Sequence, residues 1–252
     1  MFSLWRGLLK RIMPGNLYRR FVLYSRNPPV GRVDFGDLRN TTPISRVWGL
    51  DRGRPVDRYY IEHFLAANAG DVQGEVLEIG DDTYTRRYGA DKVTRSEILH
   101  VSPESPKATV VADLADAAHL PAEGFDCIIC TQTLHLIYQL EGAIGTLYRL
   151  LKAGGVLLAT APGISQISRY DMDRWGDYWR LTSASAARLF GSAFSNGQVE
   201  ISAYGNVLAA TAFLHGLSAE ELRPDELAQR DPDYQLLIAI RARKAGVQAG
   251  AP

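Results

Sequence analysis

Many residues that could bind a ligand stand directly after a short apolar stretch of this chain. In order along the sequence they are Glu78, Gly80 and Asp82, then Glu104, then Asp113 with Leu114, and then Gln132 and His135. In an open α/β sheet, ligands bind in the crevice outside the carboxyl ends of the strands. If the apolar stretches are strands, we expect these residues to gather around one ligand.

A second group of candidate residues lies in the aromatic stretch "RYDMDRWGDYWRLT". It contains Tyr170, Arg174, Trp175, Tyr178 and Trp179. Aromatic faces with flanking charges suit the binding of a sugar or another polar ring. The alternative is an aromatic lid that packs on the edge of the sheet.

Seven apolar stretches are typical of strands, and helical patterns lie between the central ones. The expected strands cover residues 75–80, 96–102, 109–114, 125–131, 155–162, 199–204 and 234–243. One helix is expected from Pro55 to Gly70, and another from residue 139 to the pair Gly154-Gly155, because glycine often ends a helix. Strands that alternate with helices predict an α/β fold with a doubly wound, mostly parallel sheet.

Positive charge is concentrated at the N-terminus, although the net charge of the whole chain is zero. Residues 1–60 contain 12 Lys and Arg against 4 Asp and Glu, and the first 30 residues contain six basic side chains and no acidic one. We expect a basic extension of helical segments and loop at 1–54, one domain at 55–243 and a flexible tail at 244–252. The amphipathic start can lie on an anionic membrane surface, or it is a helical arm packed on the domain or on a second subunit.

The sequence predicts a cytoplasmic protein, which would contact the inner membrane surface peripherally if residues 1–30 lie on a membrane and are not a packed arm. No apolar run approaches the roughly 20 residues that span a bilayer. Arg6, Lys10 and Arg11 interrupt any secretory signal. The neutral overall charge gives no reason to expect nucleic acid as a partner.

The two cysteines, Cys127 and Cys130, are spaced as a C-x-x-C pair but are expected to be core residues. They lie in "FDCIIC", which is typical of a buried strand, and side chains three positions apart on a strand point to opposite faces. A zinc site would also need further ligands nearby. We therefore expect neither a metal site nor a redox pair here.

Three ordered pieces of the sequence carry a resemblance to a known family. They are "VLEIG", then "ADLADAAHLP", and then "FDCIICTQTLHLIYQLEGAIGTLYRLLKAGGVLLATAPG". Together they resemble the class I S-adenosylmethionine-dependent methyltransferases, most of all a small bacterial group associated with glycan biosynthesis. The resemblance covers roughly residues 55–243. It implies a Rossmann-like fold with a seven-stranded sheet and S-adenosylmethionine as the cofactor.

The resemblance also implies roles for single residues. Glu78 matches the acid that helps to hold the amino acid end of the cofactor, and Gly80 lets the cofactor approach the backbone because it lacks a Cβ. Asp113, with Leu114 beside it, matches the position that reads the adenine amino group. Two alternatives stay open: Glu78 as a satisfied acid at a strand end, and Asp113 as a helix N-cap.

The remaining cofactor and acceptor residues are positional expectations. Arg58 could bind the cofactor carboxylate, and Tyr59 could close over the site. The full cofactor set is Glu78, Gly80, Asp82, Glu104, Asp113, Leu114, Gln132 and Arg58, and the acceptor set is Tyr59, Tyr170, Arg174, Trp175, Tyr178 and Trp179.

The sequence departs from the family at two places. More glycine is expected after Gly80, where this chain has Asp82 and Tyr84. An acid that takes the ribose hydroxyls is expected at the end of the second strand, where this chain has Ser102, with Glu104 two residues later. Either Glu104 reaches back to the ribose, or the ribose is held more weakly.

His135 is the candidate catalytic base for transfer of a methyl group to a hydroxyl acceptor, since it follows the fourth strand on the cofactor side. Alternatively it caps or packs the following helix. His100 lies inside the second strand and is expected in the core.

The expected function is methyl transfer to a small polar acceptor, such as the hydroxyl of a saccharide or glycan precursor. The alternative is a non-catalytic scaffold of the same fold. An NAD-dependent enzyme is disfavoured, because the chain lacks the G-x-G-x-x-G turn that pyrophosphate binding requires.

Overall fold

The computed structural model describes residues 13–15, 17 and 28–246. Most of the predicted basic N-terminal segment and residues 247–252 of the predicted tail lie outside these described residues. The chain divides into two units, Met1–Thr42 and Pro43–Pro252. The described part of the first unit contains a short 3-10 helix, η1 (Gly36–Leu38).

The second unit is built on a seven-stranded sheet in the order β3-β2-β1-β4-β5-β7-β6. The strands are β1 (Gly74–Ile79), β2 (Val93–His100), β3 (Val110–Val111), β4 (Phe125–Thr131), β5 (Leu151–Pro162), β6 (Gln198–Tyr204) and β7 (Leu237–Arg243). All neighbours are parallel except β7, which is antiparallel to both β5 and β6. The predicted doubly wound, mostly parallel sheet is confirmed.

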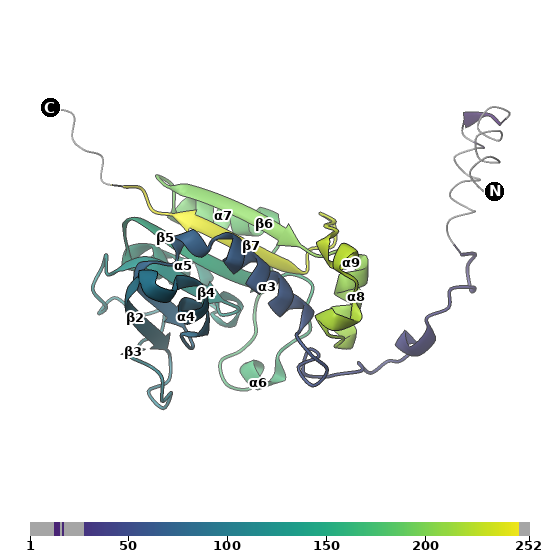
Figure 1. The fold of residues 1–252 in the computed structure, drawn as a ribbon, viewed down its shortest axis with the longest axis horizontal. Helices are drawn as coiled ribbons and strands as arrows, with labels where there is room; N and C mark the ends of the chain where they lie inside the picture. The colour runs from purple at the N-terminus through teal and green to yellow at the C-terminus, as the bar shows by residue number, and fades with distance from the viewer. Residues whose placement is uncertain (1–12, 16, 18–27, 247–252) are drawn as a thin grey trace. The chain divides into compact units, whose positions relative to one another are not determined.

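Helices cover both faces of this sheet (Figure 1). The helices are α3 (Val56–Ala67), α4 (Thr83–Gly89), α5 (Leu140–Leu150), α6 (Arg169–Met172), α7 (Ser183–Ala193), α8 (Val207–His215) and α9 (Pro224–Ala228). Short 3-10 helices connect them: η2 (Ala69–Asp71), η3 (Ala90–Lys92), η4 (Leu134–Leu136) and η5 (Ala219–Glu221).

Neighbouring residues of the central strand β4 belong to different cores. Ile128 packs with residues of α5 and α7, whereas Ile129 packs with residues of α3 and α8. Cys130 shares the first core and Cys127 the second, and both are free and fully buried. The prediction that the two cysteines are core residues on opposite faces is therefore confirmed, and burial raises the pKa of both thiols.

Two predicted boundaries were wrong because strand pairing overrides the local signal. The helix expected to end at Gly154-Gly155 ends at Leu150, since Leu151 already pairs with Phe125 of β4. The third strand is only Val110–Val111, because the chain leaves the sheet for a turn in which the Ala115 amide donates to the Asp113 carboxylate.

Within the described residues, no helix is long and apolar enough to cross a bilayer. In the same part of the chain, no group of three or more His, Cys, Asp or Glu side chains is arranged to hold a metal ion.

Candidate functional site

Two cavities meet at the carboxyl ends of the central strands. The first, which we call the Asp113 cavity, has a volume of about 340 Å³ and lies over β1, β2 and the turn after β3. The second, the Glu78 cavity, measures about 360 Å³ and lies over β1, β4 and β5. Ile79 and Gly80 line both, so the two cavities lie side by side at the end of β1. Of the three central residues of the sequence prediction, Asp113 lines the first cavity, Glu78 lines the second and Gly80 lines both.

Gly80 has the geometry of a cradle for a ligand. Its φ of +95° lies in the left-handed region, which glycine adopts without strain. Its amide donates to Leu99 O at 2.9 Å, which fixes the turn against β2. A Cβ added here would meet nothing within 4 Å, so the space beside the backbone is open to a bound molecule.

Glu78 is a buried acid, only 2% exposed, whose carboxylate caps α4. Oε1 accepts from the Tyr84 amide at 3.1 Å and Oε2 from the Thr85 amide at 2.7 Å. Burial raises its pKa to about 7, although the two amide hydrogen bonds oppose the shift. Glu78 is therefore both a satisfied acid at a strand end and a lining residue of its cavity.

The turn after β1 replaces the family's glycines with the start of a helix. Asp82 stands at the N-cap position of α4, forms an ion pair with Arg86 at 2.8 Å and lines neither cavity. Tyr84 lies in the wall of the Glu78 cavity, with its ring against that of Tyr88 at 6.1 Å between centroids. The side chain forms a wall of the cavity and does not fill it.

One carboxylate oxygen of Asp113 accepts a hydrogen bond that stabilises the turn in which the residue lies. Oδ1 accepts from the Ala115 amide at 2.8 Å, and the residue is exposed at the edge of its cavity. Leu114 is buried beside it, and Leu99 and Ala112 add apolar wall. The capping and ligand-binding interpretations of Asp113 are therefore compatible.

His100 ends β2 at the position next to Gly80, which the sequence analysis assigned to Ser102. The expectation that His100 is a core residue is wrong, since it lines the Asp113 cavity. Its Nδ1 accepts from the Ser102 amide at 2.9 Å, which leaves Nε2 as the protonated nitrogen and a donor. Glu104 is exposed and lines neither cavity. The register of β2 on β1, not visible in the sequence, decides this position.

Gln132 and His135 form an under-satisfied polar corner in the Glu78 cavity. Gln132 has a φ of +48°, a strained value for a residue other than glycine. Its Nε2 and the Nδ1 of His135 are buried without a hydrogen-bond partner in the described part of the chain. Both residues line the cavity. Strain and unpartnered buried polar atoms are typical of functional sites.

His135 is held neutral by its surroundings. Burial lowers its pKa to about 4, Asp177 opposes this shift and Arg180 adds to it. Burial alone would raise the pKa of Asp177, but the Arg180 hydrogen bond and the Ser168 amide outweigh it, so the net shift is downward. A neutral imidazole therefore faces an ionised carboxylate at neutral pH.

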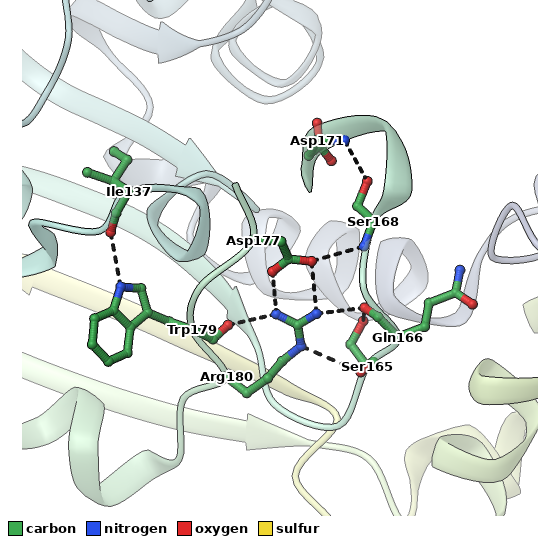
Figure 2. A network of polar contacts seen from close by, with 8 residues as sticks. All are labelled: Ile137, Ser165, Gln166, Ser168, Asp171, Asp177, Trp179 and Arg180. Carbon is green, nitrogen blue, oxygen red and sulfur yellow. Dashed lines mark hydrogen bonds and ion pairs between the residues drawn. The ribbon is translucent and has the colours of Figure 1, made fainter. Parts of the chain in front are cut away.

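Asp177 and Arg180 fix the segment 163–182 beside this corner, as Figure 2 shows. The guanidinium contacts both carboxylate oxygens, at 2.6 and 3.0 Å. Asp177 also accepts from the Ser168 amide at 2.9 Å, while Arg180 donates to Gln166 O at 2.7 Å. The segment has little regular structure, and this pair adds side-chain hydrogen bonds to the backbone hydrogen bonds of its turns.

A family model described as a methyltransferase domain matches residues 72–159, which contain β1 to β4, α5 and most of β5. Residues 72–159 therefore form a methyltransferase-type domain, as the class I resemblance of the sequence predicts. The family that this match indicates is enzymatic, with S-adenosylmethionine as its cofactor.

Solved structures of methyltransferases share the fold of this domain. An S-adenosylmethionine-dependent methyltransferase from Mesorhizobium loti is 16% identical, with a TM-score of 0.50 over 78% of this chain and 100% of that chain. The N-methyltransferase NodS from Bradyrhizobium japonicum WM9, in complex with S-adenosyl-L-homocysteine, is 19% identical, with a TM-score of 0.49 over 82% and 94%. No curated relative matches the chain.

The two cavities of the methyltransferase domain fit a cofactor with a nucleoside end and an amino acid end. The open space at Gly80 lies between them. Asp113 and the apolar walls beside it would hold the adenine, His100 the ribose, and Glu78 with Arg58 the ammonium and carboxylate groups. Bound there, the cofactor would supply an electrophilic methyl carbon on a sulfonium.

The methyltransferase domain brings only part of the predicted residue sets to the cavities. Trp175 and Tyr178 line the Asp113 cavity, and Arg58 lines the Glu78 cavity. Like Asp82 and Glu104 of the cofactor set, four residues of the acceptor set lie outside both cavities: Trp179 donates to Ile137 O, Tyr170 is exposed under the Arg174 guanidinium, and Tyr59 packs on Tyr60.

Sequence reasoning missed several lining residues of the Glu78 cavity. Trp48 and Leu50 come from the loop before α3, and Asp57 comes from the helix itself. Burial raises the pKa of Asp57 to about 6. In the sequence, only the apolar residues of "RVWGL", residues 46–50, could have indicated that this loop contributes to a cavity.

We predict that Glu78→Gln removes most of the pH dependence of S-adenosylmethionine binding. The cationic ammonium of the cofactor favours the ionised form of Glu78, whose pKa burial raises to about 7. Below that pKa the ionised fraction falls about tenfold per pH unit, so wild-type affinity should fall by up to about 15-fold between about pH 7 and about pH 5.5. Calorimetric titration measures this, with Glu104→Gln as the control. A flat wild-type profile would contradict the assignment.

We also predict that His100→Ala weakens the binding of S-adenosylhomocysteine by about two- to tenfold, the loss of one hydrogen bond. His100→Asp restores the acid that the family resemblance leads one to expect, and should retain most of the affinity. Calorimetry measures both variants, with His119→Ala, an exposed histidine outside both cavities, as the control. Equal affinities of His100→Ala and wild type would mean that His100 does not contact the ribose.

Proposed function

We propose that this methyltransferase domain transfers a methyl group to a hydroxyl of a small polar acceptor, such as a saccharide or a glycan precursor, bound in the Glu78 cavity. The observation that carries the proposal is the pair of unpartnered buried nitrogens, Gln132 Nε2 and His135 Nδ1. The side-chain amide is a donor, and the imidazole nitrogen is an acceptor when the proton resides on Nε2. A hydroxyl accepts from the first and donates to the second.

The charge of the cavity supports an acceptor without negative charge. The cavity is lined by five carboxyl groups and two guanidinium groups: Asp57, Glu78, Asp81, Asp171 and Asp177 against Arg58 and Arg180. Arg180 is already paired with Asp177. A phosphate or carboxylate near the methyl group would therefore meet like charges, whereas a neutral hydroxyl would not.

His135 can accept the proton that the hydroxyl loses. Its low pKa keeps it neutral and available, although it makes the imidazole a weak base. The imidazolium formed during transfer would lie beside the ionised Asp177, whose position Arg180 and Ser168 fix. The fixed carboxylate thus favours the charge that appears only as the reaction proceeds.

A non-catalytic scaffold is the second candidate, and one observation favours it. Both oxygens of Glu78 are already used by the amides at the start of α4. If this capping is the whole role of Glu78, the ammonium group of the cofactor would have no acid partner there, and the cofactor would be held too weakly for efficient methyl transfer.

The test is methyl transfer from labelled S-adenosylmethionine to a panel of neutral saccharides, amino sugars and sugar phosphates, read by mass spectrometry. We expect transfer to a neutral hydroxyl, and His135→Ala should lower kcat by about 10²- to 10⁴-fold, the usual contribution of a general base. Its cofactor affinity should stay close to that of wild type. His119→Ala is the matched control.

Two outcomes would overturn the proposal. Cofactor binding with no transfer to any member of the panel would favour the scaffold. Transfer that is unchanged in His135→Ala would remove the base from the mechanism.

A further inference from the structure

We propose that exposed apolar side chains at the mouth of the Glu78 cavity form a surface that docks on an anionic membrane. The surface, which we call the rim, comprises Ile44, Val47, Leu50, Ile167, Met172 and Leu214. The docking itself needs no catalysis. Its consequence for the acceptor, presentation at the membrane interface, rests on the function proposed above.

The rim side chains are large, apolar and well exposed, from 39% for Ile44 to 53% for Leu50. Single exposed apolar residues are ordinary on a protein surface, but neighbouring ones mark an interaction site. The decisive question is therefore whether these side chains, which come from three separate parts of the sequence, lie together.

Hydrogen bonds join the three parts of the rim. The Ile44 and Ser45 amides donate to His215 O at 2.8 and 3.1 Å, which places Ile44 at the end of α8 that carries Leu214. Gln166 Nε2 donates to Arg46 O at 3.1 Å, which joins the neighbours of Ile167 and Val47. In Figure 1 the chain before α3 passes between α6, below the sheet, and α8, at its right.

The rim borders the opening where an acceptor would enter. Leu50 itself lines the Glu78 cavity, and Ile167 lies between two lining residues, Gln166 and Ser168. An apolar border around a polar cavity suits a boundary between hydrocarbon and water better than free solution.

The charge of the N-terminal sequence, and not that of the acidic cavity, favours an anionic bilayer as the occupant of the rim. The rim begins at Ile44, directly after a sequence, residues 1–42, that contains eight Lys and Arg and two Asp and Glu. Anionic lipids attract basic segments, and stable attachment to a membrane takes two signals. The basic sequence would supply one and the apolar rim the other.

The experiment is co-sedimentation of the full-length protein with vesicles of phosphatidylcholine alone or mixed with phosphatidylglycerol. We expect binding to the anionic vesicles that high salt weakens, because salt screens the basic contribution. The double variant Val47→Ser/Ile167→Ser should bind these vesicles at least about fivefold more weakly, since burial of apolar side chains drives interfacial binding. Neither residue lines a cavity, so unchanged cofactor affinity verifies that the variant folds.

Val111→Ser is the matched control, because Val111 is 45% exposed on β3, at the opposite edge of the sheet from β6. The proposal is overturned if wild type ignores anionic vesicles, or if the double variant binds as wild type does. It is also overturned if the double variant turns a dimer into a monomer, which would make the rim a contact between two copies. Vesicle binding without any methyl transfer would contradict the proposed function and leave the docking surface intact.

Discussion

The buried carboxylate of Glu78 is the interaction on which the rest of the site depends. Without the usual glycines, the chain after Gly80 starts a helix, and the first amides of a helix have no partner inside it. Glu78 reaches from β1 to accept from two of them, at Tyr84 and Thr85. The same acid therefore shapes the turn, fixes the wall of its cavity and carries a proton near neutral pH, because no cation offsets its burial. In this chain the acid that is expected to bind the cofactor also stabilises the unusual turn after β1.

A second constraint connects the fold to the chemistry at the other wall. The segment 163–182 follows β5 and contains only the four-residue helix α6. Its shape depends on Arg180, which binds Asp177 with two hydrogen bonds and also donates to backbone carbonyls of the same segment (Figure 2). Charge-assisted bidentate pairs are geometrically specific. The pair also keeps Asp177 ionised beside His135. The Arg180–Asp177 contact therefore fixes the loop and also affects the pKa of His135.

Apolar runs were enough to predict the seven strands and the opposite faces of Cys127 and Cys130. They could not predict features that pairing between distant segments decides. His100 was expected in the core because "ILHVS" has no signal for the end of a strand, and only the contact of Gly80 with Leu99 shows where β2 stops. Leu151 looks helical in the sequence, yet its pairing with Phe125 ends α5. Trp48 and Leu50 lie ahead of the first helix of the domain, so no pattern within the domain could assign them to the cavity.

The polar corner at the end of β4 is unfavourable for the protein alone. A residue other than glycine in the left-handed region costs about 1–3 kcal/mol, and each unpartnered buried polar group costs a similar amount. Gln132 carries both kinds of cost, and His135 adds another buried nitrogen. The fold does not require them, since an apolar residue at either place would remove the unpartnered atom. Their presence makes sense if a ligand supplies the missing partners. A carboxylate could satisfy the amide of Gln132 but would repel the nearby Asp177, and an ammonium could satisfy the imidazole but not the amide. A hydroxyl both accepts and donates a hydrogen bond, so it matches both kinds of missing partner.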